Sequence, residues 1–430
     1  MIDVSTTQIG SGPSSGAAAP PIPFSLPWVP PGENPETYDL ERVHGMLKSA
    51  AYFSIFNVAN PDASNHANLL MRGLPLFITS VDVDEQLHRF ETAIGWAGND
   101  LRAAKQVGEA VARVGIQWTP IPDYYVAMPG RTPPLWLLNP FLSQRFCMLG
   151  GHLNFKDKDN SGVHAFGTGR TFPVNEGGKQ RLRIAAIIEV LEGLGKLKGL
   201  QGAFCINGFI EPPNNLALNL MVRMMDPAGT LRADTPIQPL EPIADPDPDA
   251  VFVSFLGEVD PEKGVHLILS PDGKGMIGSK VSELMRLVSF SFDINGPKGL
   301  QSFTKEGPII GNLEANLFFN PLSSARVIPI QTTEGVFTFH DPEGGVLGKV
   351  WANMIEGRAF RTQIDGFPMP LFRFVGFGPI LRGTGQFEGV DGMMSMNSVV
   401  SVFPRTLSNL YIFRFYDPKG KLRSAWSDIT

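Results

Sequence analysis

One glycine pattern occurs twice in this 430-residue chain, and it limits the folds that the chain can adopt. Residues 193–202 read GLGKLKGLQG and residues 383–392 read GTGQFEGVDG, so four glycines recur at the same G-x-G-x-x-x-G-x-x-G spacing. Glycine in a strand loses backbone entropy and packs no side chain, so it suits places where the chain bends sharply or lies against another backbone. The pattern therefore predicts one sharply bent strand in each of two β-barrels.

The repeat extends beyond the glycines. Residues 181–193 align without a gap with residues 371–383, and residues 216–232 align with residues 407–423 after a one-residue shift. Polar residues recur at aligned positions, namely Arg170 with Arg358, Arg183 with Arg373, Arg223 with Arg414 and Asp226 with Asp417. Duplication of one β unit is the simplest explanation.

Hydrophobic periodicity divides the chain into segments. Apolar residues alternate at period two from about Pro120 onward, and acidic, glycine-containing turns separate the candidate strands. Upstream, the stretches YDLERVHGMLKSAAYF, DEQLHRFETAIGWAG and NDLRAAKQVGEAVARVG have apolar residues at helical spacing. We therefore expect a mainly β chain: a flexible tail (1–36), a helical segment (37–118), a first antiparallel β-barrel (119–235), a proline-rich linker (236–250) and a second β-barrel (251–430).

Composition excludes several classes of function. The net charge of −6 offers no positive surface for nucleic acid, and no apolar run is long enough to cross a bilayer. The N-terminus lacks the features of a signal peptide, and Cys147 and Cys205 match no disulfide framework or zinc motif, so a cytoplasmic, reducing location is expected. The seven histidines form no compact ligand set, and no phosphate-binding loop occurs, so neither metal nor cofactor is expected. A homo-oligomer through the helical segment or a barrel face is left open.

The second copy also resembles a known family. The stretch GTGQFEGVDGMMSMNSVVSVFP, followed by LYIFRFYDPKG, resembles the closing strands of allene oxide cyclases, most specifically over 383–404. Dirigent proteins share this barrel. The resemblance implies an eight-stranded antiparallel barrel with an apolar lumen. It also implies family activities that steer cyclisation of a reactive lipid or phenolic intermediate without metal or nucleotide. It implies no particular catalytic residue, since residues 251–333 do not align with the family's early strands.

Arginines inside apolar strands are the most unusual polar feature, because an unpaired guanidinium is costly to bury. Two interpretations are open. Each arginine pairs with a carboxylate at the barrel rim or outer wall, or it holds a carboxylate or enolate oxygen in the lumen. Under the second interpretation the candidate catalytic residues are Arg373, Arg414, Tyr416, Glu356 and His340. The candidate substrate-binding residues are Arg358, Trp351, Phe374, Phe413, Arg183, Arg223, Asn219 and His164.

Two functions fit these features. The preferred hypothesis is a cofactor-independent cyclase or isomerase of secondary metabolism, in which a preformed lumen folds an apolar natural-product or lipid intermediate into one reactive conformer. The rival is a binding or carrier protein that uses the same lumen without chemistry. A weaker option is that one barrel is filled by its own side chains and serves as a scaffold for the other.

Overall fold

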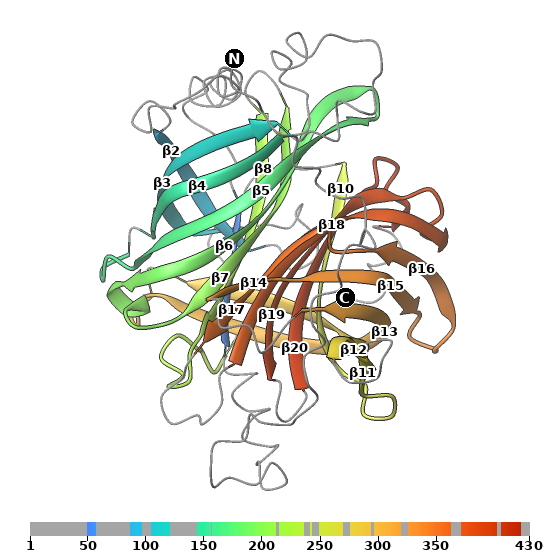
Figure 1. Cartoon of the computed structure of the whole chain (residues 1–430). Coiled ribbons are helices and arrows are strands. Elements are labelled where there is room, and N and C mark those ends of the chain that lie inside the picture. Colours follow the sequence, from blue (N-terminus) through green and yellow to red (C-terminus); the bar gives the residue numbers. More distant parts are fainter. Residues whose placement is uncertain are drawn as a thin grey trace, which may run out of the picture.

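The computed structural model describes residues 50–56, 87–96, 105–120, 144–155, 157–211, 215–235, 241–242, 249–269, 276–293, 296–319, 326–362, 371–401 and 406–422. These residues form a mainly β structure of two large antiparallel sheets (Figure 1). The predicted tail lies outside them. The first sheet contains β1 (Ala50–Phe56), β2 (Leu87–Trp96), β3 (Lys105–Pro120), β4 (Gln144–Asn154), β5 (Gly162–Glu176), β6 (Lys179–Leu194), β7 (Gly202–Glu211), β8 (Asn215–Met225) and β9 (Glu241–Pro242).

The second sheet closes on itself. It contains β10 (Ala250–Val259), β11 (Val265–Leu269), β12 (Met276–Asp293), β13 (Gln301–Phe318), β14 (Val327–Pro329), β15 (Gln331–His340), β16 (Val346–Ala352), β17 (Glu356–Thr362), β18 (Leu371–Gly385), β19 (Asp391–Ser401) and β20 (Thr406–Tyr416). Each strand in the series β10, β12, β13, β15, β16, β18, β19 and β20 pairs with the next, and β20 pairs with β10. These strands form a closed antiparallel barrel, which leaves no edge within the ring.

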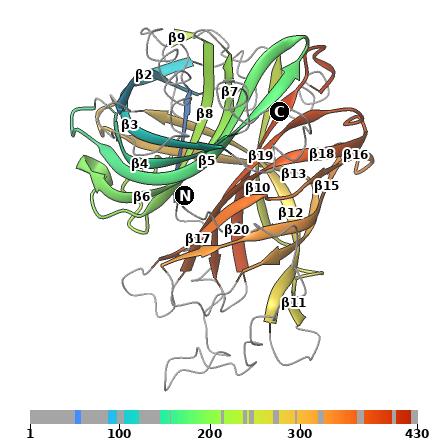
Figure 2. The same cartoon turned by 45° about the horizontal axis from the view of Figure 1, so that its top comes forward.

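The first sheet is also antiparallel, but its strand order has two ends instead of forming a ring. Its order is β1-β8-β7-β6-β5-β4-β3-β2, with β9 paired to β3, and its end strands β1 and β2 lie near each other. Figure 2 shows this sheet and the barrel as two curved bodies. They meet where β6 and β7 pack against β18 and β19, and where β1 lies against β12 and β13.

The helical prediction for the N-terminal third is wrong where the structure describes it. Residues predicted as helix form β1, β2 and β3, and β2 pairs with β3 along almost its whole length. Alanine, glutamate, lysine and arginine favour helices there, but intrinsic propensity is weak and the pairing of neighbouring strands overrides it. The predicted linker also contributes a strand, because Glu241 and Pro242 pair with β3. The domain boundaries themselves stay a prediction.

Both glycine patterns lie in equivalent settings, although not within one bent strand. Each runs from the end of one strand through a tight turn into the next strand, from β6 to β7 and from β18 to β19. A Cβ on Gly193 would lie 1.9 Å from the Leu197 carbonyl oxygen, and a Cβ on Gly383 would lie 2.0 Å from that of Phe387. The aligned turn glycines also share left-handed φ angles, +59° at Gly195 and +63° at Gly385. The repeated glycines therefore meet the same backbone requirement twice.

Replacing Gly383 with Ala is expected to lower the free energy of unfolding by about 1–3 kcal/mol, because the new methyl group collides with backbone rather than with a movable side chain. Gly193→Ala is expected to cost the same. The control is Gly344→Ala, where φ is +87° and no atom lies within 4 Å of the added carbon, so only conformational strain is introduced. Urea unfolding of the three variants measures the difference. Equal losses at all three positions would contradict the proposed contact.

Strand register supports the correspondence of the two halves. Ala50 of β1 pairs with Met225 of β8, and Ala250 of β10 pairs with Tyr416 of β20. Asp226 accepts hydrogen bonds from the backbone of Thr230 and Leu231 after β8. In the same way, Asp417 accepts them from the backbone of Lys421 and Leu422 after β20. An equivalent strand pair thus ends in an equivalent Asp-capped turn in each half, while gene duplication itself stays a prediction.

Aromatic side chains contact one another inside the second barrel. The ring of Phe255 stacks on those of Tyr411 and Phe413 at centroid distances of 5.3 and 5.6 Å, and Phe337 meets Phe413 edge to face at 4.8 Å. These rings belong to a continuous buried apolar cluster that includes residues from every strand of the ring. Such offset and edge-to-face contacts add to the free energy gained by burying the rings.

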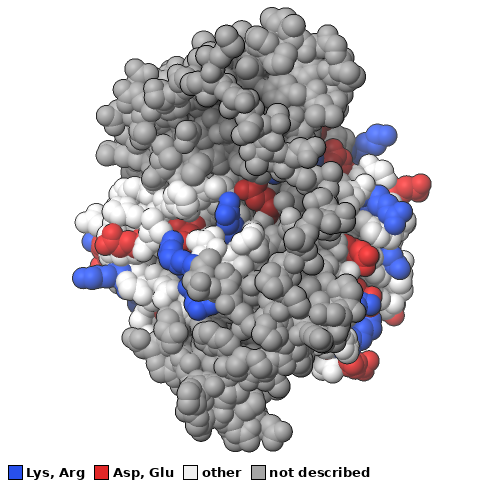
Figure 3. Space-filling model, viewed as in Figure 1, with Lys and Arg blue, Asp and Glu red and all other residues white. Residues whose placement is uncertain are grey.

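The surface of the described residues carries charges of both signs. Lysine and arginine lie beside aspartate and glutamate over the described part of the face in Figure 3. Within the part of the chain that the structure describes, no helix has the length and apolarity to cross a membrane.

Candidate functional site

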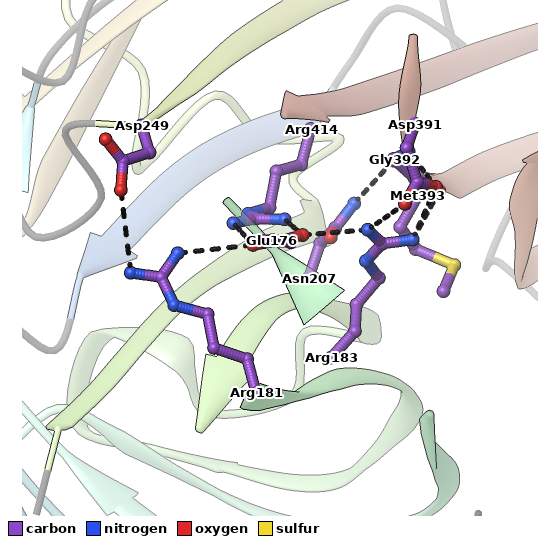
Figure 4. Close-up of polar contacts among 9 residues, drawn as sticks. All are labelled: Glu176, Arg181, Arg183, Asn207, Asp249, Asp391, Gly392, Met393 and Arg414. Carbon is purple, nitrogen blue, oxygen red and sulfur yellow. Dashed lines mark hydrogen bonds and ion pairs between the residues drawn. The ribbon is translucent and has the colours of Figure 1, made fainter. Parts of the chain in front are cut away.

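A buried carboxylate joins the two sheets where they meet. Glu176, the last residue of β5, accepts two hydrogen bonds from Arg414 of β20, at 2.9 and 3.0 Å (Figure 4). It also accepts one from Arg183 at 2.8 Å and one from Arg181 at 3.2 Å, both on β6. The carboxylate and these three guanidinium groups are almost inaccessible to solvent. We call these four residues the arginine cluster.

Electrostatics keep this carboxylate ionised. Burial raises the pKa of Glu176, but the hydrogen bonds and charges of Arg414 and Arg183 outweigh burial and bring the pKa down to about 2. Two further carboxylates at the margin add negative charge, with Asp391 at 3.0 Å from Arg183 and Asp249 at 3.7 Å from Arg181. The cluster is therefore an ion-pair network that joins the sheets.

Reciprocal hydrogen bonds surround this cluster. Asn207 of β7 donates to the Met393 carbonyl at 3.0 Å, and the aligned Asn397 of β19 donates to the Ala203 carbonyl at 2.8 Å, Ala203 being the residue aligned with Met393. The aligned arginines do the same, since Arg183 donates to the carbonyl of Gly392 and Arg373 donates to that of Gly202. Contacts that repeat in both directions are typical of a two-fold interface between identical subunits. Here they join two halves of one chain.

Two more of the predicted arginines, Arg373 and Arg223, also lie at this contact. Arg373 reaches Glu189 of β6 at 3.0 Å, and Arg326 binds the same carboxylate at 2.6 Å. Arg223 of β8 donates to the Ser408 carbonyl at 2.6 Å and to the Asn397 carbonyl at 3.2 Å. Arg373 thus pairs with a carboxylate, whereas Arg223 donates to backbone carbonyls and to the Ser408 hydroxyl. Catalytic or binding roles for them stay predictions.

The other candidate catalytic residues are not gathered at one place. Glu356 of β17 accepts hydrogen bonds from Thr168 and Arg170 of β5, at 3.1 and 2.9 Å. His340 lies at the end of β15, with Nε2 at 3.2 Å from Asn312 Oδ1. Tyr416 is half-buried at the end of β20, and its hydroxyl occupies the space beside Gly177.

The candidate binding residues divide between the barrel interior and the surface. Phe374 and Phe413 belong to the buried apolar cluster inside the second barrel, and a binding role for them stays a prediction. Trp351 is half-buried under the guanidinium of Arg382, at 4.1 Å from the ring centroid, and Arg358 lies on β17. His164 is exposed and lies 3.2 Å from Glu192. Asn219 pairs with Phe56 through the backbone, and its side chain lies outside what the structure describes. No cluster of three or more potential metal ligands occurs among the described residues.

A second polar group lies inside the barrel and was missed by the sequence analysis. Ser398 of β19 faces Asn409 of β20, Asn409 faces Gly257 of β10, and Glu283 of β12 fills the space beside Gly257. We call Ser398, Asn409, Tyr411 and Glu283 the lumen polar row. All four are buried, and Tyr411 also stacks on the aromatic layer.

Hydrogen bonding in this row is one-sided. Glu283 Oε1 accepts from Asn409 Nδ2 at 2.6 Å and from the Tyr411 hydroxyl at 3.2 Å. Glu283 Oε2, Asn409 Oδ1 and Ser398 Oγ are buried and have no hydrogen-bond partner among the described residues. Since a buried polar atom without a partner costs free energy, three such atoms in neighbouring positions indicate a site for something that pairs with them.

The burial of Glu283 changes its protonation. Burial raises the pKa of this carboxyl to about 8, and the hydrogen bonds from Tyr411 and Asn409 oppose the rise only in part. Burial, reinforced by the nearby Glu283 charge, also raises the pKa of Tyr411 well above its ordinary value. Near neutral pH the row therefore contains a protonated carboxylic acid, and its pKa lies in the range that suits acid–base catalysis.

A sequence signal for this row was present. Glu283 lies at period two with Val281, Met285 and Leu287, so one carboxylate interrupts an apolar strand face. The polar candidates that the sequence predicted on β20, Arg414 and Tyr416, share one face, whereas Asn409 and Tyr411 lie on the opposite face with Phe413.

Comparison with known proteins gives little further information. No protein-family model matches the chain, and no curated protein matches it. Among the solved structures that match is that of a pterocarpan synthase dirigent protein, with 16% identity over 39% of this chain and 84% of that chain, at a TM-score of 0.23. The barrel described above is therefore established by its strand pairing.

Proposed function

We propose that this protein is a cofactor-independent cyclase or isomerase that acts on an apolar natural-product or lipid intermediate within the second barrel. The observation that carries the proposal is the lumen polar row, in which a neutral Glu283 lies beside Asn409 and Tyr411 in an otherwise apolar interior. Perturbed acids in apolar surroundings are typical of acid–base sites.

The chemistry follows from the protonation of Glu283. Oε1 is occupied by two donors, so the acidic proton resides on Oε2, which has no acceptor among the described residues. Oε2 transfers this proton to a substrate oxygen, and the resulting carboxylate takes a proton from the substrate as the ring closes or the double bond moves. The atoms balance without a co-reactant, since the product is an isomer of the substrate. Asn409 and Tyr411 stabilise the carboxylate formed between the two steps.

A carrier function is the second candidate, and the aromatic layer favours it. Phe255, Phe337 and Phe413 offer apolar rings without chemistry, which suits storage of a hydrophobic molecule. Binding alone needs no proton transfer, so a variant that keeps the shape of Glu283 but cannot ionise separates the two functions.

Glu283→Gln is expected to abolish turnover while ligand binding persists. Gln keeps the size and hydrogen-bonding capacity of the side chain but cannot donate a proton, and loss of a general acid typically lowers the rate by about 10²–10⁴-fold. Mass spectrometry of compounds that co-purify with the protein identifies the ligand, and the same compound is then assayed for isomerisation by the wild type and the variant. Unchanged turnover by Glu283→Gln would refute the catalytic role. Binding without turnover by either protein would favour a carrier.

A further inference from the structure

We infer that the lumen polar row selects an uncharged ligand whose ketone or ether oxygen accepts a hydrogen bond from Glu283 Oε2. The inference rests on the proposed function and adds the chemical class of the ligand. It differs from the sequence expectation of a fixed cation holding an anionic oxygen.

The donors and acceptors of the row that are not yet paired define what the ligand must offer. Oε1 of Glu283 is already paired with Asn409 Nδ2 and the Tyr411 hydroxyl, so the group left for a ligand is the Oε2 hydroxyl, which is a donor. A donor requires an acceptor, and a ketone or ether oxygen supplies one without a charge. Asn409 Oδ1 is likewise buried without a partner among the described residues, so it offers an acceptor to a ligand hydroxyl.

The positions of the cations argue against an anionic ligand. The buried arginines among the described residues of the second barrel are Arg373 and Arg414, and both bind carboxylates of the first sheet, Glu189 and Glu176. A ligand carboxylate beside Glu283 would be buried near another acid without these cations. Burial of an unpaired charge is strongly unfavourable.

A cationic ligand fits the row less well than a neutral one. A cation would pair only with ionised Glu283. Among the described residues, Tyr411 is the titratable group that contacts this carboxyl. Tyr411 and Asn409 stabilise a charge on Oε1 only in part, so a cationic ligand would also have to displace the proton of a carboxyl whose pKa is about 8. The space for Oε2 exists because position 257 is glycine, where a Cβ would lie 1.9 Å from that oxygen. Gly257 is thus a positioning residue for the donor.

Three naphthalene probes that differ only in the attached group test the inference on the full chain. They are 2-acetylnaphthalene, 2-naphthoate and 2-naphthylmethylammonium, titrated by fluorescence at pH 6.5. We expect the ketone to bind at least about tenfold more tightly than either charged probe. Binding of the ketone should weaken about tenfold in Glu283→Leu and stay within about threefold in Glu283→Gln, which keeps a donor at this position.

Repeating the ketone titration at pH 9.5 tests the inference on the wild type itself, with Glu283→Gln as the control. The wild type should bind more weakly once Oε2 has lost its proton, whereas Glu283→Gln should bind equally at both pH values. Absent ketone binding, equal or tighter binding of a charged probe, or unchanged ketone binding in Glu283→Leu would overturn the inference. These titrations measure binding alone, so their outcome does not depend on turnover. A Glu283→Gln variant with full activity would refute the proposed acid but not the ligand preference.

Discussion

Glu176→Gln is expected to lower the free energy of unfolding by about 3–5 kcal/mol, the range measured when one partner of a buried ion pair is removed. The amide keeps the volume of the side chain but leaves Arg181, Arg183 and Arg414 buried without their central anion. Arginine cannot relieve this by losing its proton. Because Arg414 belongs to the second barrel and Glu176 to the first sheet, the loss falls on the contact between them.

Asp391→Asn is the matched control for this substitution. Asp391 also binds Arg183, at 3.0 Å, but its side chain is 53% exposed, so solvent screens the pair and the loss should be about 0–1 kcal/mol. Urea unfolding at pH 7 compares the two variants. Limited proteolysis of folded Glu176→Gln should also cleave between the sheets faster than in the wild type. Equal stability of the two variants would show that the arginine cluster does not hold the sheets together.

Acid should weaken the same contact in the wild type. The pKa of Glu176 is lower in the folded chain than in an unfolded one, so its contribution is complete above about pH 4.5 and declines as the pH falls toward about 2. Glu176→Gln removes this dependence.

Strand positions were predictable from the sequence, because apolar residues at every second position indicate a strand with a buried face. Period-two alternation predicted strands from about Pro120 onward, and the described part of that region contains β6, β8, β10, β18 and β20 among its strands. The aligned polar residues also predicted correctly that Asp226 and Asp417 occupy equivalent places. Local pattern carries this information because both copies meet the same backbone requirements.

The faces of these strands were not predictable, and the candidate site was missed for that reason. On β20 both faces are apolar, since Phe413 lies in the barrel while Ile412 packs toward the first sheet. When both faces of a strand are buried, alternation cannot distinguish the lumen from an interface. Arg414 was therefore placed in a lumen in one interpretation. Its actual partner, Glu176, is distant in sequence, and no local pattern links the two.

Stability of the protein should fall as the pH rises from about 4.5 to about 8, because of Glu283. The pKa of this carboxyl is about 8 in the folded protein against 4.5 for its ordinary value. Over this window an unfolded chain releases the proton while the folded chain keeps it. The contribution of Glu283 to the free energy of unfolding is therefore complete below pH 4.5 and declines until about pH 8, where the folded form ionises too.

The expected decline over this window is about 5 kcal/mol, since each pKa unit corresponds to about 1.4 kcal/mol. Glu283→Gln should remove the decline and so be more stable than the wild type at pH 8, whereas the two proteins should differ little at pH 4.5. The Glu176 contribution declines only below pH 4.5, so the two carboxyls act in separate windows and can be measured on one chain. Urea unfolding from pH 4.5 to 9 gives both curves. Parallel curves would mean that Glu283 is ionised throughout, which would remove the proton that the proposed acid must donate.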